Sequence, residues 1–293
     1  MDFLVIGHVC KDLTPQGYRL GGTATYAATT ALRLGRTPGI VTRASREIVE
    51  GNVFEGMHLH LLPSEVTTTF ENVYQGGSRR QFLHAVAGPI GPQDVPAAWR
   101  KTPIVLLAPL AQEVAPEMAG LFGGGLVGVV PQGWMRRWDA AGRVGPTAWT
   151  TAEQVLSCAA VLVLSQEDVG GNTHQVARYS LLVDYLVLTQ GASGATLYHH
   201  GRAVHLPARP ATEADPTGAG DVFAAAFLVR LGEGADPVEA ARFANAVASF
   251  SVEAPGITGI PWRHQVQAWL AAHPDWGWPQ EPWPARQAME GSA

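Results

Sequence analysis

Ala214-Asp215-Pro216-Thr217-Gly218-Ala219-Gly220-Asp221 is the most informative segment of this 293-residue sequence. It opens into the apolar run Val222–Arg230, which Gly232 follows, so it is predicted to be a loop that feeds a helix N-terminus and the helix is predicted to stop at that glycine. Two glycines separated by one alanine let the backbone turn several N–H groups toward one point. Together with the helix dipole, these groups would form a binding site for an anion.

Asp221 stands where this loop becomes helix, so its carboxylate is expected beside the anion site. A base in that place can take a proton from a hydroxyl while the amides of Gly218, Ala219 and Gly220 stabilise a phosphoryl group in transfer. The same residues also fit a plain helix start, because Asp is a favoured N-cap. Local chemistry alone leaves both interpretations open.

The segment Asp215–Asp221 closely resembles the D-T-x-G-A-G-D signature of the ribokinase, or PfkB, family of carbohydrate and nucleoside kinases. Pro216 in place of the usual Thr is the departure within the motif. The resemblance implies an ATP-dependent kinase in which Asp221 is the base and Gly218, Ala219 and Gly220 form the anion hole. It also implies that Asp215 either binds the acceptor or supports a monovalent cation such as K⁺.

Composition narrows the class of protein. Charged residues make up 15% of the chain and the formal net charge is −5, which argues against a nucleic-acid partner. Lys11 and Lys101 are its two lysines and neither follows a glycine, so a Walker-type G-K-[ST] loop is excluded. Cys10 and Cys158 lie far apart and indicate neither a disulfide framework nor a metal site. Without a basic leader or an apolar run of transmembrane length, we expect a cytoplasmic protein with no membrane partner.

Acceptor contacts are expected near the start of the chain. Phe3–Gly7 is a short apolar run ended by glycine, typical of a buried strand in a parallel sheet. Asp12 follows it, and Gly21 and Gly22 precede a predicted helix over Thr23–Leu34. The resemblance implies that Asp12 and the two glycines touch the acceptor. The alternative is a turn residue followed by a tight turn.

Two segments bear on the choice of acceptor. Many sugar-kinase relatives carry an Asn that binds a sugar hydroxyl where this chain has Ala24–Tyr26, so a preference for ribose does not transfer. Pro131–Arg136 resembles a D-x-Q-G-x-x-R segment of the branch that includes inositol kinase-like proteins, with Val130 in place of the Asp. Gln132 and Arg136 are therefore candidates for contacts with the acceptor or phosphate, or are ordinary surface residues. The branch implies a cyclitol such as myo-inositol, or a ketose, with a nucleoside as the alternative.

Strand patterns at about 10–22 and 58–88 predict a small β lid. His58–Leu62, Thr67–Tyr74 and Arg80–Leu83 alternate or are rich in β-branched and aromatic residues, and Gly76-Gly77 is the expected turn. The resemblance implies that such strands cover the acceptor pocket and can join two copies of the chain as a homodimer.

A magnesium contact is predicted after the apolar strand Ala160–Leu164, because ligands bind at the carboxyl ends of strands in open α/β sheets. The family carries N-x-x-E there, which organises waters around Mg²⁺. This chain has Ser165 for the Asn and Asp168 for the Glu, with Glu167 adjacent. Carboxylates acting through water suit Mg²⁺. Alternatively, Glu167 and Asp168 simply favour the N-terminus of the next helix.

Nucleotide contacts are implied by two further segments. Thr189, Gly191 and Gly194 match the T-x-G-x-x-G turn that approaches the ATP phosphates and ribose in the family, although the isolated pattern is a plain hairpin. Asn245 and Ser249 lie in a later predicted helix that relatives place against the adenine.

The middle of the chain adds a buried strand, Ile104–Ala108, with a crossover helix expected around Leu110 and Glu117. Gly123–Gly128 formally matches G-x-G-x-x-G, but it precedes an apolar run and is predicted to enter a strand rather than to bind a dinucleotide.

Alternating strands and helices predict a single α/β domain over residues 1–293, with a doubly wound, mainly parallel sheet, helices on both faces and a small β lid. This is the ribokinase-like fold that the resemblance implies. The leading function is phosphorylation of a hydroxyl on a small polyol. The competing class is a non-catalytic sensor of a sugar or nucleotide, supported by Val130 and Ser165 at positions where relatives carry Asp and Asn.

Overall fold

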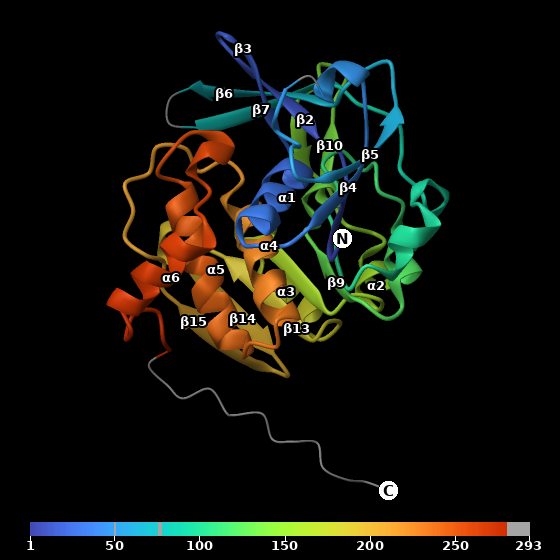
Figure 1. Ribbon diagram of the computed structural model, residues 1–293. Helices are drawn as coiled ribbons and strands as arrows, with labels where there is room; N and C mark the ends of the chain where they lie inside the picture. Colours follow the sequence, from blue (N-terminus) through green and yellow to red (C-terminus); the bar gives the residue numbers. More distant parts are fainter. Residues whose placement is uncertain (50, 76–77, 280–293) are drawn as a thin grey trace, which may run out of the picture.

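The computed structural model of the chain describes residues 1–49, 51–75 and 78–279 (Figure 1). Its centre is a nine-stranded sheet with the order β15-β14-β13-β12-β9-β8-β1-β4-β5. All neighbours from β13 to β5 run parallel, whereas β14 and β15 are added antiparallel. The strands are β1 (Phe3–Ile6), β4 (Pro38–Ala44), β5 (His58–Pro63), β8 (Ile104–Leu107), β9 (Leu126–Val129), β12 (Val161–Ser165), β13 (Tyr185–Thr189), β14 (Ala195–His199) and β15 (Arg202–Leu206).

Both faces of this sheet are covered, and the buried strands show why. Phe3 and Val5 of β1 pack into one apolar layer, and Leu4 and Ile6 into the other. A strand buried on both faces needs a continuous apolar run, because successive side chains point to opposite faces. The predicted α/β class with helices on both faces is confirmed.

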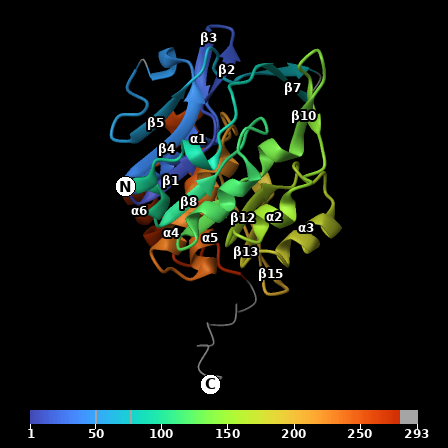
Figure 2. The ribbon, with the colours of Figure 1, turned by 90° about the vertical axis from the view of Figure 1, so that its right-hand side faces the viewer.

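The helices divide between the two layers (Figures 1 and 2). One layer holds α1 (Thr23–Arg33), α4 (Ala219–Gly232), α5 (Pro237–Ser251) and α6 (Arg263–Ala272); the other holds α2 (Ala152–Leu156), α3 (Thr173–Ser180) and the 3₁₀ helices η4 (Pro116–Phe122) and η5 (Gln132–Met135). The remaining 3₁₀ helices are η1 (Arg46–Val49), η2 (Pro92–Asp94), η3 (Ala97–Lys101), η6 (Gly191–Ser193) and η7 (Gly256–Gly259). Within the residues described, no helix combines the length and apolarity needed to cross a bilayer.

A second sheet of four strands, in the order β3-β2-β6-β7, lies beyond one end of the large sheet. Its strands are β2 (Cys10–Thr14), β3 (Gly17–Gly21), β6 (Thr69–Gln75) and β7 (Ser78–Ala85). The hairpin of β10 (Arg136–Trp138) and β11 (Val144–Pro146) rises to meet it, and the Leu83 N–H donates to the Gly142 carbonyl at 2.8 Å (Figure 2).

The prediction of lid strands over 58–88 was wrong at its start. His58–Pro63 is not part of the small sheet: it pairs in parallel with β4 and forms the edge of the large sheet. An alternating hydrophobic pattern identifies a strand but not the strand with which it pairs. Here the free backbone N–H and C=O groups along β4 form hydrogen bonds with β5. The predicted turn at Gly76-Gly77 lies outside the described residues.

One helix prediction needs correction. The residues after β8 form a loop and the 3₁₀ helix η4 instead of a crossover α-helix, because the Glu113 carboxylate takes the N–H groups of Leu110 and Ala111 that a helix would use. The predicted stop at Gly232 is confirmed, since α4 ends at that residue and Gly234, with a left-handed φ of +82°, follows. The loop-to-strand interpretation of Gly123–Gly128 is confirmed, since β9 begins within it.

A buried polar junction joins the two sheets where β1 ends. Glu113 accepts the His8 N–H at 2.9 Å, and the His8 ring contacts the Thr68 hydroxyl at 2.7 Å and the Gly88 carbonyl at 3.0 Å. The Thr68 hydroxyl also accepts the Ala87 N–H. Every one of these groups is satisfied if the Thr68 hydroxyl donates to His8 Nδ1 and His8 Nε2 donates to Gly88, which fixes the orientation of the ring between the two sheets.

Candidate active site

The loop before α4 is held in place by Asp215. One carboxylate oxygen of Asp215 accepts the Thr217 N–H at 3.0 Å, and the other accepts the Gly256 N–H at 3.1 Å and pairs with Arg19. Burial raises the pKa of Asp215, but these hydrogen bonds outweigh it and leave the pKa below its ordinary value. Asp215 therefore stays ionised and fixes the path of the loop, a role that the local sequence did not reveal.

Gly218, not Asp221, is the N-cap of α4. Its backbone is left-handed, with φ of +79°, and a Cβ atom here would lie 2.4 Å from the Tyr26 ring. Only glycine fits this position without strain. Asp221 lies in the first turn, and no side-chain cap is present. The alternative in which Asp221 merely caps the helix is therefore wrong.

Backbone N–H groups at this turn are available to an anion. Val222 begins the regular helical pattern by donating to the Gly218 carbonyl at 2.9 Å. Ala219 donates to the Pro216 carbonyl at 3.2 Å, so its N–H is engaged. Among the residues described, the N–H groups of Gly218, Gly220 and Asp221 have no such acceptor. The first turn thus presents unpaired donors beside a carboxylate, as expected for an anion site.

Asp221 has an unusual pKa, raised to about 7 by burial, and this effect outweighs contacts that lower it. The Thr23 hydroxyl and the Arg136 guanidinium lower the pKa, whereas the charges of Asp168 and Asp12 raise it. A carboxyl group that titrates near neutrality can accept a proton at physiological pH and release it again. These effects also show that four of the residues predicted from sequence, Asp12, Arg136, Asp168 and Asp221, share one electrostatic environment.

Asp12 reaches the site because two glycines leave room for it. It lies on β2 opposite Arg19 of β3, and a Cβ atom on Gly21 would be 1.9 Å from an Asp12 carboxylate oxygen. Gly22, with φ of +87°, begins α1 and its Cβ would meet the His8 carbonyl at 2.7 Å. The Gly-Gly pair is therefore a steric requirement for bringing β3, α1 and the Asp12 carboxylate together.

Three further residues near Asp221 are not marked as site residues by any sequence motif. Tyr26 and Cys10 are buried, and burial together with nearby carboxylates raises the pKa of each, so both stay neutral. Thr23 is fully buried, and its hydroxyl lies close enough to the Asp221 carboxylate to lower the pKa of that group. All three flank motif positions, but no pattern of residue types marks them.

Glu167 and Asp168 follow β12, at the carboxyl end of the strand. Asp168 accepts the Ser165 N–H at 2.8 Å, and the Ser165 hydroxyl accepts the Asp168 N–H in return. Gln132 donates to the other Asp168 oxygen at 3.4 Å, and Glu167 is exposed. No cluster of three or more metal-binding side chains occurs in the described residues. Two carboxylates with water and substrate phosphates still fit Mg²⁺, which is usually bound in that way.

The residues expected near the nucleotide form two groups. Gly191 and Gly194 have φ of +57° and +99°, and the Thr189 hydroxyl donates to the Leu164 carbonyl at 3.4 Å. Asn245 donates to the Leu206 carbonyl at 3.0 Å. The Ser249 hydroxyl accepts the N–H of Arg209 and donates to the carbonyl of Asn245. The side chains of Asn245 and Ser249 thus hold the loop after β15, so any contact they make with a nucleotide stays a prediction.

Comparison with known proteins agrees with this geometry. Residues 158–263 match the model of the pfkB family carbohydrate kinases. The chain is 29% identical over 292 residues to inositol 3-kinase of Zea mays, covering 90% of this chain and 74% of the relative. It is 42% identical to ribokinase of Bacillus subtilis (strain 168) over 87 residues, which is 29% of this chain and 30% of that protein.

Solved structures show the same fold. A pyrophosphate-dependent kinase in the ribokinase family, complexed with a pyrophosphate analog and myo-inositol, superposes with a TM-score of 0.78 at 23% identity, over 91% of this chain and 99% of that chain. Arabidopsis thaliana ribokinase complexed with ribose and ATP gives a TM-score of 0.71 at 21% identity, over 92% of this chain and 98% of that chain.

Proposed function

The chain belongs to the ribokinase family of PfkB-type carbohydrate kinases, which are phosphotransferases, and we propose that it transfers a phosphoryl group from ATP to a hydroxyl of a small sugar or cyclitol. One observation carries the proposal: Asp221 lies beside unpaired N–H groups in the first turn of α4, and its pKa is raised to about 7. A base and an anion site share a single turn of helix, which is what phosphoryl transfer to an alcohol requires.

Each residue has a distinct task in the proposed reaction. Asp221 takes the proton from the attacking hydroxyl, and the N–H groups of Gly218 and Gly220 stabilise the charge that develops on the transferred phosphoryl oxygens. The engaged N–H of Ala219 becomes available if the Pro216 carbonyl shifts when phosphate binds. Arg136, whose charge lowers the pKa of Asp221, adds positive charge to the same place.

Mg²⁺ and the nucleotide have candidate ligands. Glu167 and Asp168 would hold Mg²⁺ through water, and the ion would neutralise the donor phosphates when bound. Thr189, Gly191 and Gly194 would approach the nucleotide from the turn after β13. Asp215 already has three partners, Thr217 in the loop, Gly256 after α5 and Arg19 on β3, so we assign it to positioning rather than to acceptor binding. A role beside a monovalent cation such as K⁺ stays a prediction.

The proposed acceptor is a cyclitol such as myo-inositol or a ketose. Similarity to plant inositol 3-kinase over 90% of this chain supports this choice, and Asp12 offers a carboxylate to substrate hydroxyls beside Gly21 and Gly22. A nucleoside is the second candidate, because a segment of 101 residues is 35% identical to a nucleoside kinase of Methanocaldococcus jannaschii. The four-stranded sheet would cover the acceptor, and a homodimer through it stays a prediction.

A non-catalytic sensor is the competing function. Its support is Val130 and Ser165, at positions where relatives carry Asp and Asn. Of these, Ser165 exchanges two hydrogen bonds with Asp168 and so has a defined role. The retained base and glycines favour turnover.

The deciding experiment measures phosphorylated product by NMR with myo-inositol, other cyclitols, ketoses, ribose and nucleosides as acceptors. Each acceptor is tested with Mg-ATP and with Mg-pyrophosphate, and Asp221→Asn gives the background. We expect turnover with one acceptor class and its loss in the variant. ATP binding without product from any acceptor would favour the sensor instead.

A further inference from the structure

A cavity of about 310 Å³ lies between β7, the β10–β11 hairpin and the end of β12. It is lined by Arg80 and Gln81 of β7, Arg143 and Val144 of the hairpin, and Glu167. This volume is at the lower end of the range for ligand pockets, about 300–1,000 Å³. We propose that the cavity binds a phosphate group of a substrate, held between the Arg80 and Arg143 guanidinium groups. The proposal rests on the proposed function for the identity of that substrate.

Arg80 and Arg143 line this cavity in a protein whose net charge is −5. Glu167 is the acidic residue of the lining, so the two arginines outnumber the acidic side chains there. A basic group on an acidic protein attracts an anionic ligand locally, because the rest of the surface repels it.

Arg80 and Arg143 form no ion pair with a carboxylate among the described residues, whereas seven other arginines do. Elsewhere, Arg19 pairs with Asp215 and Arg209 with Glu253. An unpaired guanidinium keeps its five donors available in a planar fork that matches phosphate oxygens. Two such groups facing one cavity are better explained by an anionic ligand than by folding stability.

The backbone of Arg143 is held in place by contacts within the protein. Its N–H donates to an Asp139 carboxylate oxygen at 2.9 Å, and its backbone forms an antiparallel bridge with Phe82 of β7. The neighbouring Gly142 has φ of +78°, and a Cβ there would lie 2.5 Å from the Leu83 carbonyl. Glycine is thus needed for the close approach that brings the hairpin and β7 together. A preorganised site loses less entropy when a ligand binds.

Glu167 determines the form in which phosphate binds. Its exposed carboxylate on the cavity wall opposes a bare anion but favours a phosphate that carries Mg²⁺. Glu167 of the cavity wall precedes Asp168 in the chain, and the charge of Asp168 raises the pKa of Asp221. The phosphate can belong to the donor or to an acceptor that is already phosphorylated.

The test compares Arg80→Gln and Arg143→Gln with Arg137→Gln. Arg137 is on the same hairpin but does not line the cavity, and its side chain donates to the Pro146 carbonyl, so its variant is the matched control. Calorimetry measures the affinity for pyrophosphate with Mg²⁺, for Mg-ATP and for D-fructose 6-phosphate, and melting temperatures confirm that each variant is folded. We expect each cavity variant to lower the affinity for at least one probe by about tenfold or more. The control variant should change each affinity by less than about twofold.

Weaker binding of pyrophosphate and Mg-ATP would support the proposal and assign the phosphate to the donor. Weaker binding of D-fructose 6-phosphate alone would support it and assign the phosphate to the acceptor. Unchanged affinity for all three probes in both cavity variants would overturn it. These assays measure binding and not turnover. If the protein showed no turnover but Arg143→Gln still lowered its affinity for pyrophosphate, the proposed function would be disproved and this inference would stand.

Discussion

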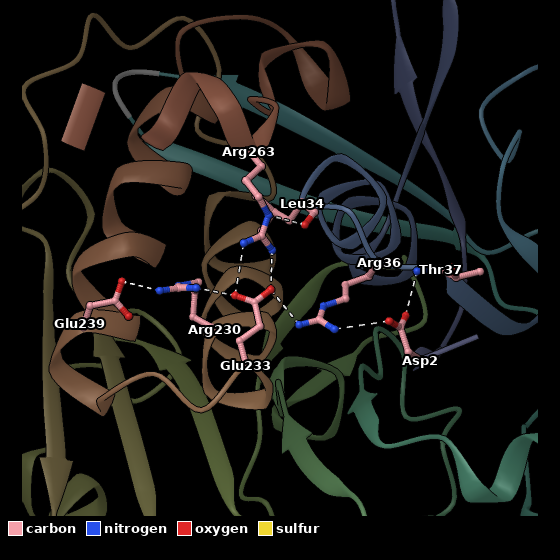
Figure 3. A network of polar contacts seen from close by, with 8 residues as sticks. All are labelled: Asp2, Leu34, Arg36, Thr37, Arg230, Glu233, Glu239 and Arg263. Carbon is pink, nitrogen blue, oxygen red and sulfur yellow. Dashed lines mark hydrogen bonds and ion pairs between the residues drawn. The ribbon is translucent and has the colours of Figure 1, made fainter. Parts of the chain in front are cut away.

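The two ends of helix α4 differ in whether their polar groups have hydrogen-bond partners. At its N-terminal end, Asp221 is held beside N–H groups that have no acceptor among the described residues. At its C-terminal end, Glu233 accepts hydrogen bonds from Arg36, Arg230 and Arg263 (Figure 3). One end keeps its polar groups unpaired for a substrate, and the other pairs them to hold the fold.

The paired end connects segments that are far apart in the chain. Arg36 follows α1 and also contacts Asp2, Arg230 also pairs with Glu239 of α5, and Arg263 begins α6. Figure 3 shows these side chains converging on Glu233 from three directions. A network of this kind fixes geometry better than isolated surface pairs, which contribute about 0–1 kcal/mol each.

The pKa values of Asp221 and Glu233 reflect this difference in pairing. Burial raises the pKa of both groups, but at Glu233 the hydrogen bonds from Arg263 and Arg230 outweigh it and the pKa falls below its ordinary value. At Asp221 burial dominates and the pKa rises to about 7. The presence or absence of hydrogen-bonded arginines therefore decides whether a buried acid stabilises the fold or stays reactive.

The largest expected effect is the loss of turnover in Asp221→Asn. An amide cannot accept the proton, so kcat should fall by about 10²–10⁴, while the affinity for the nucleotide changes only a few-fold. Steady-state rates and nucleotide binding by calorimetry measure the two quantities. Turnover at the wild-type rate would remove Asp221 from the role of base.

The same variant should stabilise the fold. The pKa of Asp221 is about 7 in the folded state and about 3.9 in the unfolded state, so the stability present below pH 4 is lost as pH rises through 7. Asn does not ionise, and Asp221→Asn should therefore raise the free energy of unfolding by about 2–4 kcal/mol at pH 8. Urea unfolding at pH 4 and pH 8 measures this, and equal effects at both pH values would contradict it.

Glu233→Gln should have the opposite effect. Removing the carboxylate leaves three arginines without their shared partner, and partial exposure limits the loss to about 1–3 kcal/mol. The control is Glu153→Gln, whose pair with Arg178 is exposed and should contribute much less to stability. This stabilisation exists above the unfolded pKa of Glu and is lost as pH falls through the lowered folded pKa.

Urea unfolding of both Glu variants, with kcat measured in parallel, tests whether the two ends of α4 have separate roles in stability and in catalysis. We expect kcat to be unchanged in Glu233→Gln. A large loss of turnover at unchanged fold would show that the network also supports catalysis.

The smallest expected effect concerns Thr23. Its buried hydroxyl lowers the pKa of Asp221, so Thr23→Val should move the midpoint of the pH–rate profile above its position near 7 and reduce kcat/KM at pH 6.5 by about two- to fivefold. Thr23→Ser keeps the hydroxyl and should restore the profile. Identical profiles for the three proteins would show that Thr23 only packs.

Sequence motifs identified much of the candidate site, because the motif residues lie where strands and α4 begin or end. Asp12, Arg136, Asp168 and Asp221 were all named before their proximity was known. The sequence marks Tyr26 only as part of a segment where relatives carry Asn, since its contact with Gly218 is made across the fold. The edge position of β5 and the 3₁₀ helix after β8 were missed for the same reason: each depends on a distant partner.

Most strands, the helices α1, α4 and α5, the family resemblance and the loop that leads into α4 follow from the sequence, because short-range backbone preferences and periodicity are local properties. The tertiary structure alone decided which sheet β5 joins, how far burial raises the pKa of Asp221, and that Arg80 and Arg143 face one cavity. Pairing, burial and electrostatic coupling act through space between residues distant in the chain, so no local pattern encodes them.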